Sequence, residues 1–318
     1  MANIATSADI LELSLFNASE ATDGTSDLDT QAVIYLNRAY RELYMGGQAF
    51  LPDVNETWWW MKAEASLILQ PEVTTGTVSV TNNSATAEFS VTPAPDIDSD
   101  ATGWFMKVSG HPDIFKISSI TTTTGTLDSV YTGTTNATAS YTLFKLDYDL
   151  SSSAIKLLGR MTCSQKGQYQ IIGQSQSEMD REFPLALVTS GIPTRFAHVD
   201  ENTVRFNRWG GSSSGELIRV DYDYLTKPTD LADDTTEPLV PTQYRHVLAD
   251  MVTYYLLGDK NDTQQEIYGF QAKAGIRSMA DENKARWAQI GKSGHIYPRQ
   301  RNTRQSILKT ANEQIIIG

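Results

Sequence analysis

GWFMKVSGHPDIFKISSITTTTGTLDSVYTG, residues 103–133, is the stretch that decides the predicted fold. Side chains alternate along its first part, with Trp104 and Met106 on one side and Phe105 and Lys107 on the other, which is the period of a β-strand. Short apolar runs are separated by turns rich in Thr and Gly. The chain has helical periodicity on both sides of the β-rich part, so the sequence predicts a β-module in the middle of a helical protein.

The predicted β-module covers residues 71–146. Ser and Thr make up 26 of these 76 residues, and few residues of the segment favour a helix. TGTVSVTNNSATAEFSV alternates around Asn82 and Asn83, which suits a hairpin turn because Asn tolerates positive φ. We interpret the TGT triplets, one of them at residues 132–134, as turns between strands. Short strands with turns about every eight to twelve residues indicate a small sandwich or barrel.

Residues 26–47 predict a first amphipathic helix. They begin with Ser26 and Asp27, which are good N-cap residues, and then place apolar side chains at three- and four-residue spacing. Gly46 and Gly47 end the pattern.

Residues 241–260 and 263–290 predict two further helices. The short GDKNDT connection between them indicates an antiparallel pair. In the second helix Ile267, Phe270 and Ala274 continue the helical spacing. The residues expected to pack the bundle are Tyr40, Tyr44, Tyr244, Leu248 and Tyr255.

A second β-region follows the module. Residues 147–162 are ambiguous and are read as one helical turn or more, whereas residues 168–226 return to strand patterns. We therefore predict an α+β fold, an antiparallel helical bundle with an inserted small β-sandwich or barrel and a second antiparallel β-region. The predicted parts are the N-terminal helical part of the bundle (1–70), the inserted β-module (71–146), the second β-region (147–240), the C-terminal helices (241–290) and an extended basic arm (291–318).

Composition excludes several classes of protein. The 318 residues carry a net charge of −12, which argues against a general nucleic-acid binder. The N-terminus lacks the basic region and cleavage site of a signal peptide, and no run of eighteen apolar residues could cross a membrane. Cys163 is the one cysteine, so a disulfide within the chain is impossible. We expect a soluble intracellular protein without a membrane partner.

The C-terminal arm has its own charge. Residues 291–318 carry +4, which leaves −16 for the preceding 290 residues. The basic side chains could contact phosphate or dock onto an acidic protein partner, and the terminal isoleucines favour docking by addition to a sheet edge. The predicted docking residues are Lys292, Arg299, Arg301, Arg304, Lys309, Ile315, Ile316 and Ile317.

The three consecutive tryptophans Trp58, Trp59 and Trp60 cannot all face one core on a helix or a strand. At least one must face a second surface. The sequence leaves two interpretations open, a junction between domains and a contact with a partner.

The search for catalytic motifs finds none. The chain has no phosphate-binding GxxxxGK[ST] loop, no GxGxxG after a strand and no GxSxG. The pairs Asp147/Asp149 and Asp221/Asp223 could bind a cation or act as acid and base, but a solvated sheet face is the simpler reading. The four histidines, His111, His198, His246 and His295, are scattered. We predict no enzyme activity, no metal site and no cofactor.

The order of elements resembles the head–tail connector adaptor proteins of tailed bacteriophages. The similarity is strongest over residues 190–287 and rests on LNRAYREL in the first helix, on GIPTRFAHVDENTVRFNR, and on the P-x-x-Y-x-x-x-L element of Pro241, Tyr244 and Leu248. The β-insert goes beyond the minimal adaptor and looks like a decoration of larger members.

The resemblance implies a structural virion protein of the neck, made in the host cytoplasm. Such adaptors form rings, typically of twelve copies, under the portal protein and bind a tail nozzle or tail-completion protein below. The C-terminal arm would reach the portal, and the β-insert would contact neighbours or tail fibres. Double-stranded DNA would pass through the ring without specific binding, which an acidic body favours.

Two other classes remain open at this point. The first is a tail-fibre-attachment or carbohydrate-binding module with Trp104, Trp209 and the tryptophans of residues 58–60 as sugar platforms. The second is a hydrolase that uses the paired aspartates, although these lack a matched histidine or nucleophile.

Overall fold

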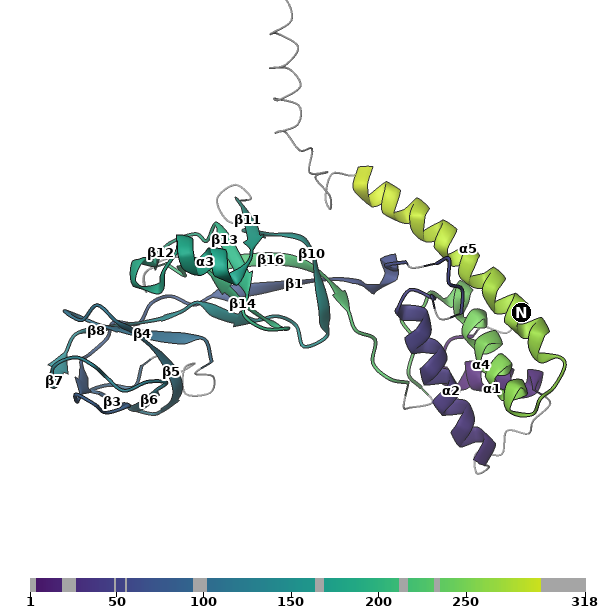
Figure 1. Ribbon diagram of the computed structural model, residues 1–318, viewed down its shortest axis with the longest axis horizontal. Helices are drawn as coiled ribbons and strands as arrows, with labels where there is room; N and C mark the ends of the chain where they lie inside the picture. Colours follow the sequence, from purple (N-terminus) through teal and green to yellow (C-terminus); the bar gives the residue numbers. More distant parts are fainter. Residues whose placement is uncertain are drawn as a thin grey trace, which may run out of the picture. The chain divides into compact units, whose positions relative to one another are not determined.

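The computed structural model describes residues 4–18, 27–48, 50–54, 56–93, 102–163, 169–211, 217–231 and 235–292. Contacts divide the chain into two compact units (Figure 1). The helical unit contains residues 1–62 and 228–318, and the β unit contains residues 63–227. The sequence analysis predicted that the helical parts end at residue 70 and resume after residue 240. The chain enters the β unit through strand β1 (Lys62–Leu69) and leaves it through β16 (Ile218–Thr226), which pair with each other.

The fold-class prediction is wrong. The described residues form a mainly β protein with two seven-stranded sheets, a small third sheet and five α-helices, not a helical bundle with a small insert. Residues 62–69 were assigned to the bundle and are strand β1. The ambiguous residues 147–162, for which a helical turn or more is considered, contain β9 (Asp147–Asp149) and most of β10 (Ala154–Cys163). Alternation was hard to recognise in β10 because its register with β16 shifts twice.

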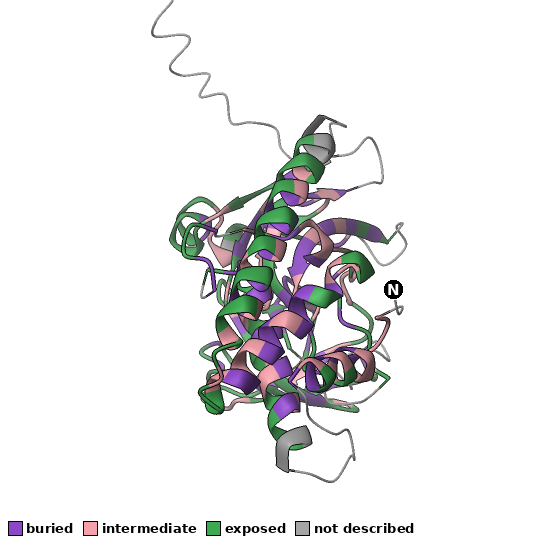
Figure 2. Cartoon of the chain, turned by 90° about the vertical axis from the view of Figure 1, so that its right-hand side faces the viewer, coloured by how far each residue is buried: buried purple, intermediate pink, exposed green. Residues whose placement is uncertain are grey.

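The helical unit consists of α1 (Ser7–Asn17), α2 (Asp27–Tyr44), α4 (Arg245–Asp259) and α5 (Gln265–Lys292). Helices α2, α4 and α5 confirm the predicted helices, and α4 packs against α1, α2 and α5. The sequence analysis missed α1, although Thr6 and Asp9 form a capping box at its start. Figure 2 shows exposed residues along the visible side of α5. The core includes Ile10, Leu36, Leu43, Leu248, Met251 and Ile276.

The carboxyl group of Asp250 on α4 makes the stability of the helical unit depend on pH. Burial raises the pKa of Asp250 to about 6, and His246 one turn earlier partly opposes the shift. The stabilising protonated form is fully present below the ordinary pKa of 3.8 and is lost as the pH rises through about 6. We expect Asp250→Asn to raise the free energy of unfolding at pH 8 by roughly 1 kcal/mol, after discounting for partial exposure.

Denaturant titrations of both chains at pH 4 and pH 8 check this prediction. The gain should shrink toward zero at pH 4, where the wild-type carboxyl is already largely protonated. An equal gain at both pH values would mean that ionisation of Asp250 is not its cause.

Seven strands of the β unit form a barrel. Their order is β7-β2-β3-β6-β5-β4-β8, and a single residue, Ser140, joins the two edge strands β7 and β8. The chain passes directly from one edge strand to the other, so the sheet curls into a barrel. Asn83 adopts φ 60° in the β2–β3 turn, as its sequence predicts. The strands are β2 (Val78–Val80), β3 (Thr86–Phe89), β4 (Trp104–Val108), β5 (Ile114–Thr121), β6 (Thr124–Leu127), β7 (Asn136–Ala139) and β8 (Tyr141–Lys145).

The second large sheet has the order β1-β16-β10-β11-β13-β14-β9. Strands β11 and β13 are parallel, so the predicted purely antiparallel region is wrong at this point. The chain connects these two strands through α3 (Gln176–Glu182), as parallel neighbours require a crossover. The remaining strands are β9 (Asp147–Asp149), β10 (Ala154–Cys163), β11 (Tyr169–Gln174), β13 (Arg195–His198) and β14 (Thr203–Phe206), and β12 (Thr189–Ser190) pairs with β15 (Arg208–Trp209) in the third sheet.

An aromatic cluster joins the barrel to the small third sheet within the β unit. Phe144 of β8 stacks on Trp209 of β15, with ring centroids 4.3 Å apart, and on Phe105 of β4 at 6.0 Å. Beside it Asp147 and Arg205 form a bidentate ion pair across β9 and β14, with distances of 2.6 and 2.9 Å. The guanidinium of Arg205 lies over the Phe105 ring.

Candidate assembly sites

The residues predicted to pack the bundle lie in the helical unit. Tyr40 of α2 is buried, meets the edge of the Tyr44 ring at 6.1 Å and accepts a hydrogen bond from the backbone N–H of Leu239 at 2.9 Å. Burial raises the pKa of Tyr40 to about 12. Leu248 of α4 is fully buried. The hydrogen bond between Tyr40 and Leu239 holds the segment before α4 against α2.

Two tyrosine–glutamate contacts connect the helices. The Tyr255 hydroxyl of α4 donates to Glu42 of α2, and Arg38 binds Glu42 at 3.0 Å while lying over the Tyr255 ring. Burial and the Glu42 carboxylate raise the pKa of Tyr255. The Tyr244 hydroxyl donates to Glu282 of α5 at 2.5 Å, and this bond lowers the pKa of Glu282.

The three consecutive tryptophans have different surroundings. Trp58 is fully buried and its indole N–H donates to the Leu43 carbonyl at 2.5 Å. Trp59 is partly exposed, with Arg286 over its ring at 4.9 Å. Trp60 stacks on Trp58 at 6.2 Å, and its buried indole N–H has no hydrogen-bond partner among the described residues. The sequence correctly indicated that these side chains do not share one environment.

Three of the five tryptophans proposed as sugar platforms, Trp58, Trp104 and Trp209, are buried. Trp104 lies in the barrel core, and Trp209 lies under Phe144 with its indole N–H donating to Glu72 at 3.0 Å. A buried indole cannot offer its face to a sugar ring.

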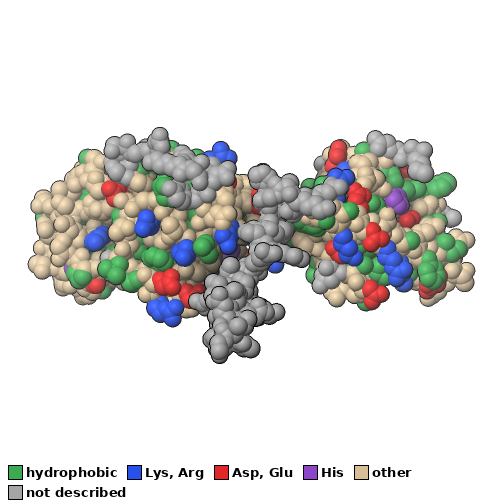
Figure 3. Space-filling model, turned by 90° about the horizontal axis from the view of Figure 1, so that it is seen from above, with side chains coloured by type: hydrophobic (Ala, Val, Ile, Leu, Met, Phe, Trp, Pro, Cys, Tyr) green, Lys and Arg blue, Asp and Glu red, His purple; other side chains and the backbone are tan. Residues whose placement is uncertain are grey.

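An apolar stripe on α5 faces outward. Ile267 is 55% exposed, Phe270 is 68% exposed, and Ala274 one turn later is also exposed. The core side of α5 instead carries Ala272, Ile276 and Met279. The predicted helical spacing of Ile267, Phe270 and Ala274 is confirmed, but the spacing did not show which apolar row of α5 faces the core. Figure 3 shows hydrophobic side chains among charged ones on the visible face of the helical unit.

Three of the four paired aspartates bind neighbouring side chains. Asp147 is buried in its ion pair with Arg205, and Asp149 accepts a hydrogen bond from the Thr203 hydroxyl at 2.8 Å. Asp221 binds Arg219 at 2.7 Å. Within the described ranges no three His, Cys, Asp or Glu side chains gather in a group that could hold a metal ion.

No protein-family model matches the chain, and no curated protein matches it. None of the helices in the described part of the chain has the length and apolarity needed to cross a membrane. The predicted docking arm lies outside the described residues, apart from the backbone of Lys292 at the end of α5.

Proposed function

We propose that this chain is a structural subunit of a phage head–tail connector, an adaptor that assembles as a ring under the portal protein and has no catalytic activity of its own. The observation that carries the proposal is the outward stripe of Ile267 and Phe270 on α5. Large apolar side chains grouped on one exposed helix face are typical of protein–protein interfaces. In a ring each subunit would cover this stripe with a surface of its neighbour.

The organisation of the chain supports the same proposal. Its two ends form one helical unit, and the β unit is inserted between α2 and α4. The P-x-x-Y-x-x-x-L element lies at the start of α4, where Tyr244 reaches α5 and Leu248 reaches the core. In the proposed assembly the helices build the ring, typically of twelve copies, and the barrel is available to neighbours or tail fibres.

Charge supports the proposed partners. The first 290 residues carry −16 and the last 28 carry +4. An acidic wall would let double-stranded DNA slide through the ring without specific binding. The basic arm would dock on the portal protein, and the opposite side of the ring would bind a tail nozzle or tail-completion protein. The proposed location is the neck of the virion.

The test is the mass of the purified chain, alone and mixed with a candidate portal protein, by light scattering after size exclusion. We expect a ring-sized complex on the portal. The double variant Ile267→Ser/Phe270→Ser should melt like the wild type but fail to form the ring, because the exposed stripe contributes to assembly and not to the core. Val130→Ser is a matched control, since Val130 is also exposed but belongs to the β unit.

A chain ending at Lys292 separates docking from ring formation. It keeps α5 intact and should lose affinity for the portal while melting normally. A wild-type chain that stays monomeric with the portal contradicts the adaptor proposal. Unchanged portal affinity after truncation contradicts the role of the arm alone.

A further inference from the structure

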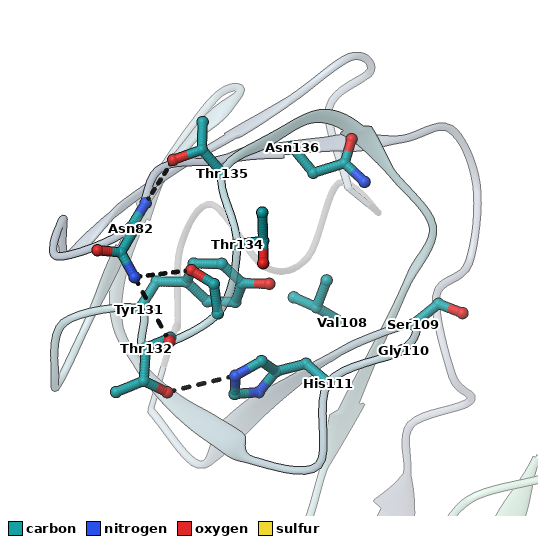
Figure 4. A pocket seen from close by; sticks show the side chains of 11 residues that line it. Asn82, Val108, Ser109, Gly110, His111, Tyr131, Thr132, Thr134, Thr135 and Asn136 are labelled. Carbon is teal, nitrogen blue, oxygen red and sulfur yellow. Dashed lines mark hydrogen bonds between the residues drawn. The ribbon is translucent and has the colours of Figure 1, made fainter.

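A polar pocket of about 670 Å³ opens at one end of the barrel (Figure 4). Three loops converge on it: the β2–β3 turn with Asn82, the β4–β5 loop with His111, and the segment from Tyr131 to Asn136 before β7. The volume falls in the range of small-molecule sites. The pocket is distinct from the helical surfaces assigned to ring assembly.

Hydrogen bonds fix the walls of this pocket. The backbone N–H of Asp113 donates to His111 Nδ1 at 3.1 Å, which places the imidazole proton on Nε2, 3.3 Å from the Thr132 hydroxyl. The Thr132 hydroxyl donates to Asp113 at 2.9 Å and closes the ring of bonds. On the other side the Asn82 amide donates to the Gly133 carbonyl at 2.8 Å. These groups are already paired and serve to position the loops.

Tyr131 provides the polar group that the pocket leaves unused. The residue is 4% exposed, and its ring packs against Phe115 at 5.4 Å and His111 at 5.1 Å. Its hydroxyl has no hydrogen-bond partner among the described residues and points into the pocket (Figure 4). This hydroxyl is not among the fully buried polar atoms that lack a partner, so it is open to the pocket, where a ligand oxygen can take the place of water as its partner.

Gly133 keeps this hydroxyl accessible. A Cβ atom at Gly133 would overlap both the Tyr131 hydroxyl and the His111 ring. The backbone of Gly133 does not adopt positive φ, so no turn conformation requires glycine here. Glycine is needed instead because the space beside the Tyr131 hydroxyl has no room for a Cβ atom. The TGT triplet at residues 132–134, read from sequence as turn chemistry, therefore has a role in shaping the pocket.

The lining chemistry selects a neutral ligand rich in hydroxyl groups. Lys, Arg, Asp and Glu do not occur among the residues that line the pocket. The hydroxyls of Tyr131, Thr134 and Ser109 line the pocket, and each can donate or accept a hydrogen bond, as a sugar hydroxyl does. We propose that this end of the barrel binds a neutral saccharide, which would give the β unit a glycan-recognition function beyond ring assembly.

The experiment is binding of the full-length wild-type chain to an array of neutral and anionic glycans, followed by calorimetric titration of a retained neutral saccharide. Tyr131→Phe removes only the unpaired hydroxyl and should weaken binding about tenfold without lowering the melting temperature. Tyr141→Phe is the matched control, because the buried Tyr141 hydroxyl donates to the Thr75 carbonyl at 2.8 Å and does not line the pocket. It should bind the saccharide like the wild type.

Thr134→Val changes an exposed hydroxyl and provides a second variant that preserves the fold. It should also weaken binding. The proposal is overturned if the wild-type chain retains no neutral glycan, if it retains only anionic glycans, or if Tyr131→Phe and Thr134→Val bind as tightly as the wild type. Each of these outcomes leaves the ring-assembly proposal untouched.

Discussion

Replacing Trp58 with alanine should lower the free energy of unfolding of the helical unit by about 4 kcal/mol. Trp58 is among the largest side chains that the fold buries completely. Its removal leaves a cavity, because the indole lies beside Gly47 and stacks on Trp60. It also leaves the Leu43 carbonyl without the indole N–H that donates to it.

The adjacent Trp59 provides the matched control. Trp59→Ala loses a partly exposed ring and its contact with Arg286, but the backbone N–H that donates to Asn283 at 2.8 Å remains. We expect a loss of only about 1 kcal/mol. Denaturant unfolding followed by circular dichroism at the helical band measures both variants. Equal losses would show that the burial of Trp58 is not what stabilises this part of the chain.

Replacing Arg205 with methionine should lower the free energy of unfolding of the β unit by about 3 kcal/mol. The substitution leaves the buried Asp147 carboxylate without its bidentate partner in a low-dielectric environment. Hydrogen bonding to Asp147 raises the pKa of Arg205, so the guanidinium stays charged in the folded state. Arg205 also lies over Phe105, so the variant loosens the junction between the second sheet and the barrel.

Two further variants separate the ion pair from its surroundings. Arg219→Met removes an exposed partner of Asp221 and should cost less than about 1 kcal/mol. The double variant Arg205→Met/Asp147→Leu should recover part of the loss, since it leaves no buried charge. Urea titrations of all three chains provide the measurement. If the double variant is less stable than Arg205→Met, the unpaired carboxylate is not the source of the destabilisation.

The candidate sites could be predicted from sequence only in part. Tyr40 and Leu248 were found because their spacing indicates a helix face, which is a local property, whereas Tyr244 lies in the 3-10 turn before α4. The exposure of Ile267 and Phe270 could not be read in the same way, because α5 carries apolar residues on more than one face and α4 covers only one of them.

The barrel pocket left no signal in the sequence. His111 and Tyr131 are twenty residues apart, Asn82 comes still earlier, and no spacing rule connects them. They meet because the β2–β3 turn, the β4–β5 loop and the segment that leads into β7 reach the same end of the barrel. A search for sequence motifs therefore could not assign a role to His111.

The sequence by itself determined the local elements: the helices α2, α4 and α5, the β2–β3 turn at Asn83 and the charge contrast of the C-terminal residues. Each depends on neighbours within a few positions along the chain. Only the tertiary structure decided that β1 pairs with β16, that β11 and β13 are parallel, and that Asp147 meets Arg205. Strand partners are chosen by contacts between segments far apart in the chain, so a local period cannot specify them.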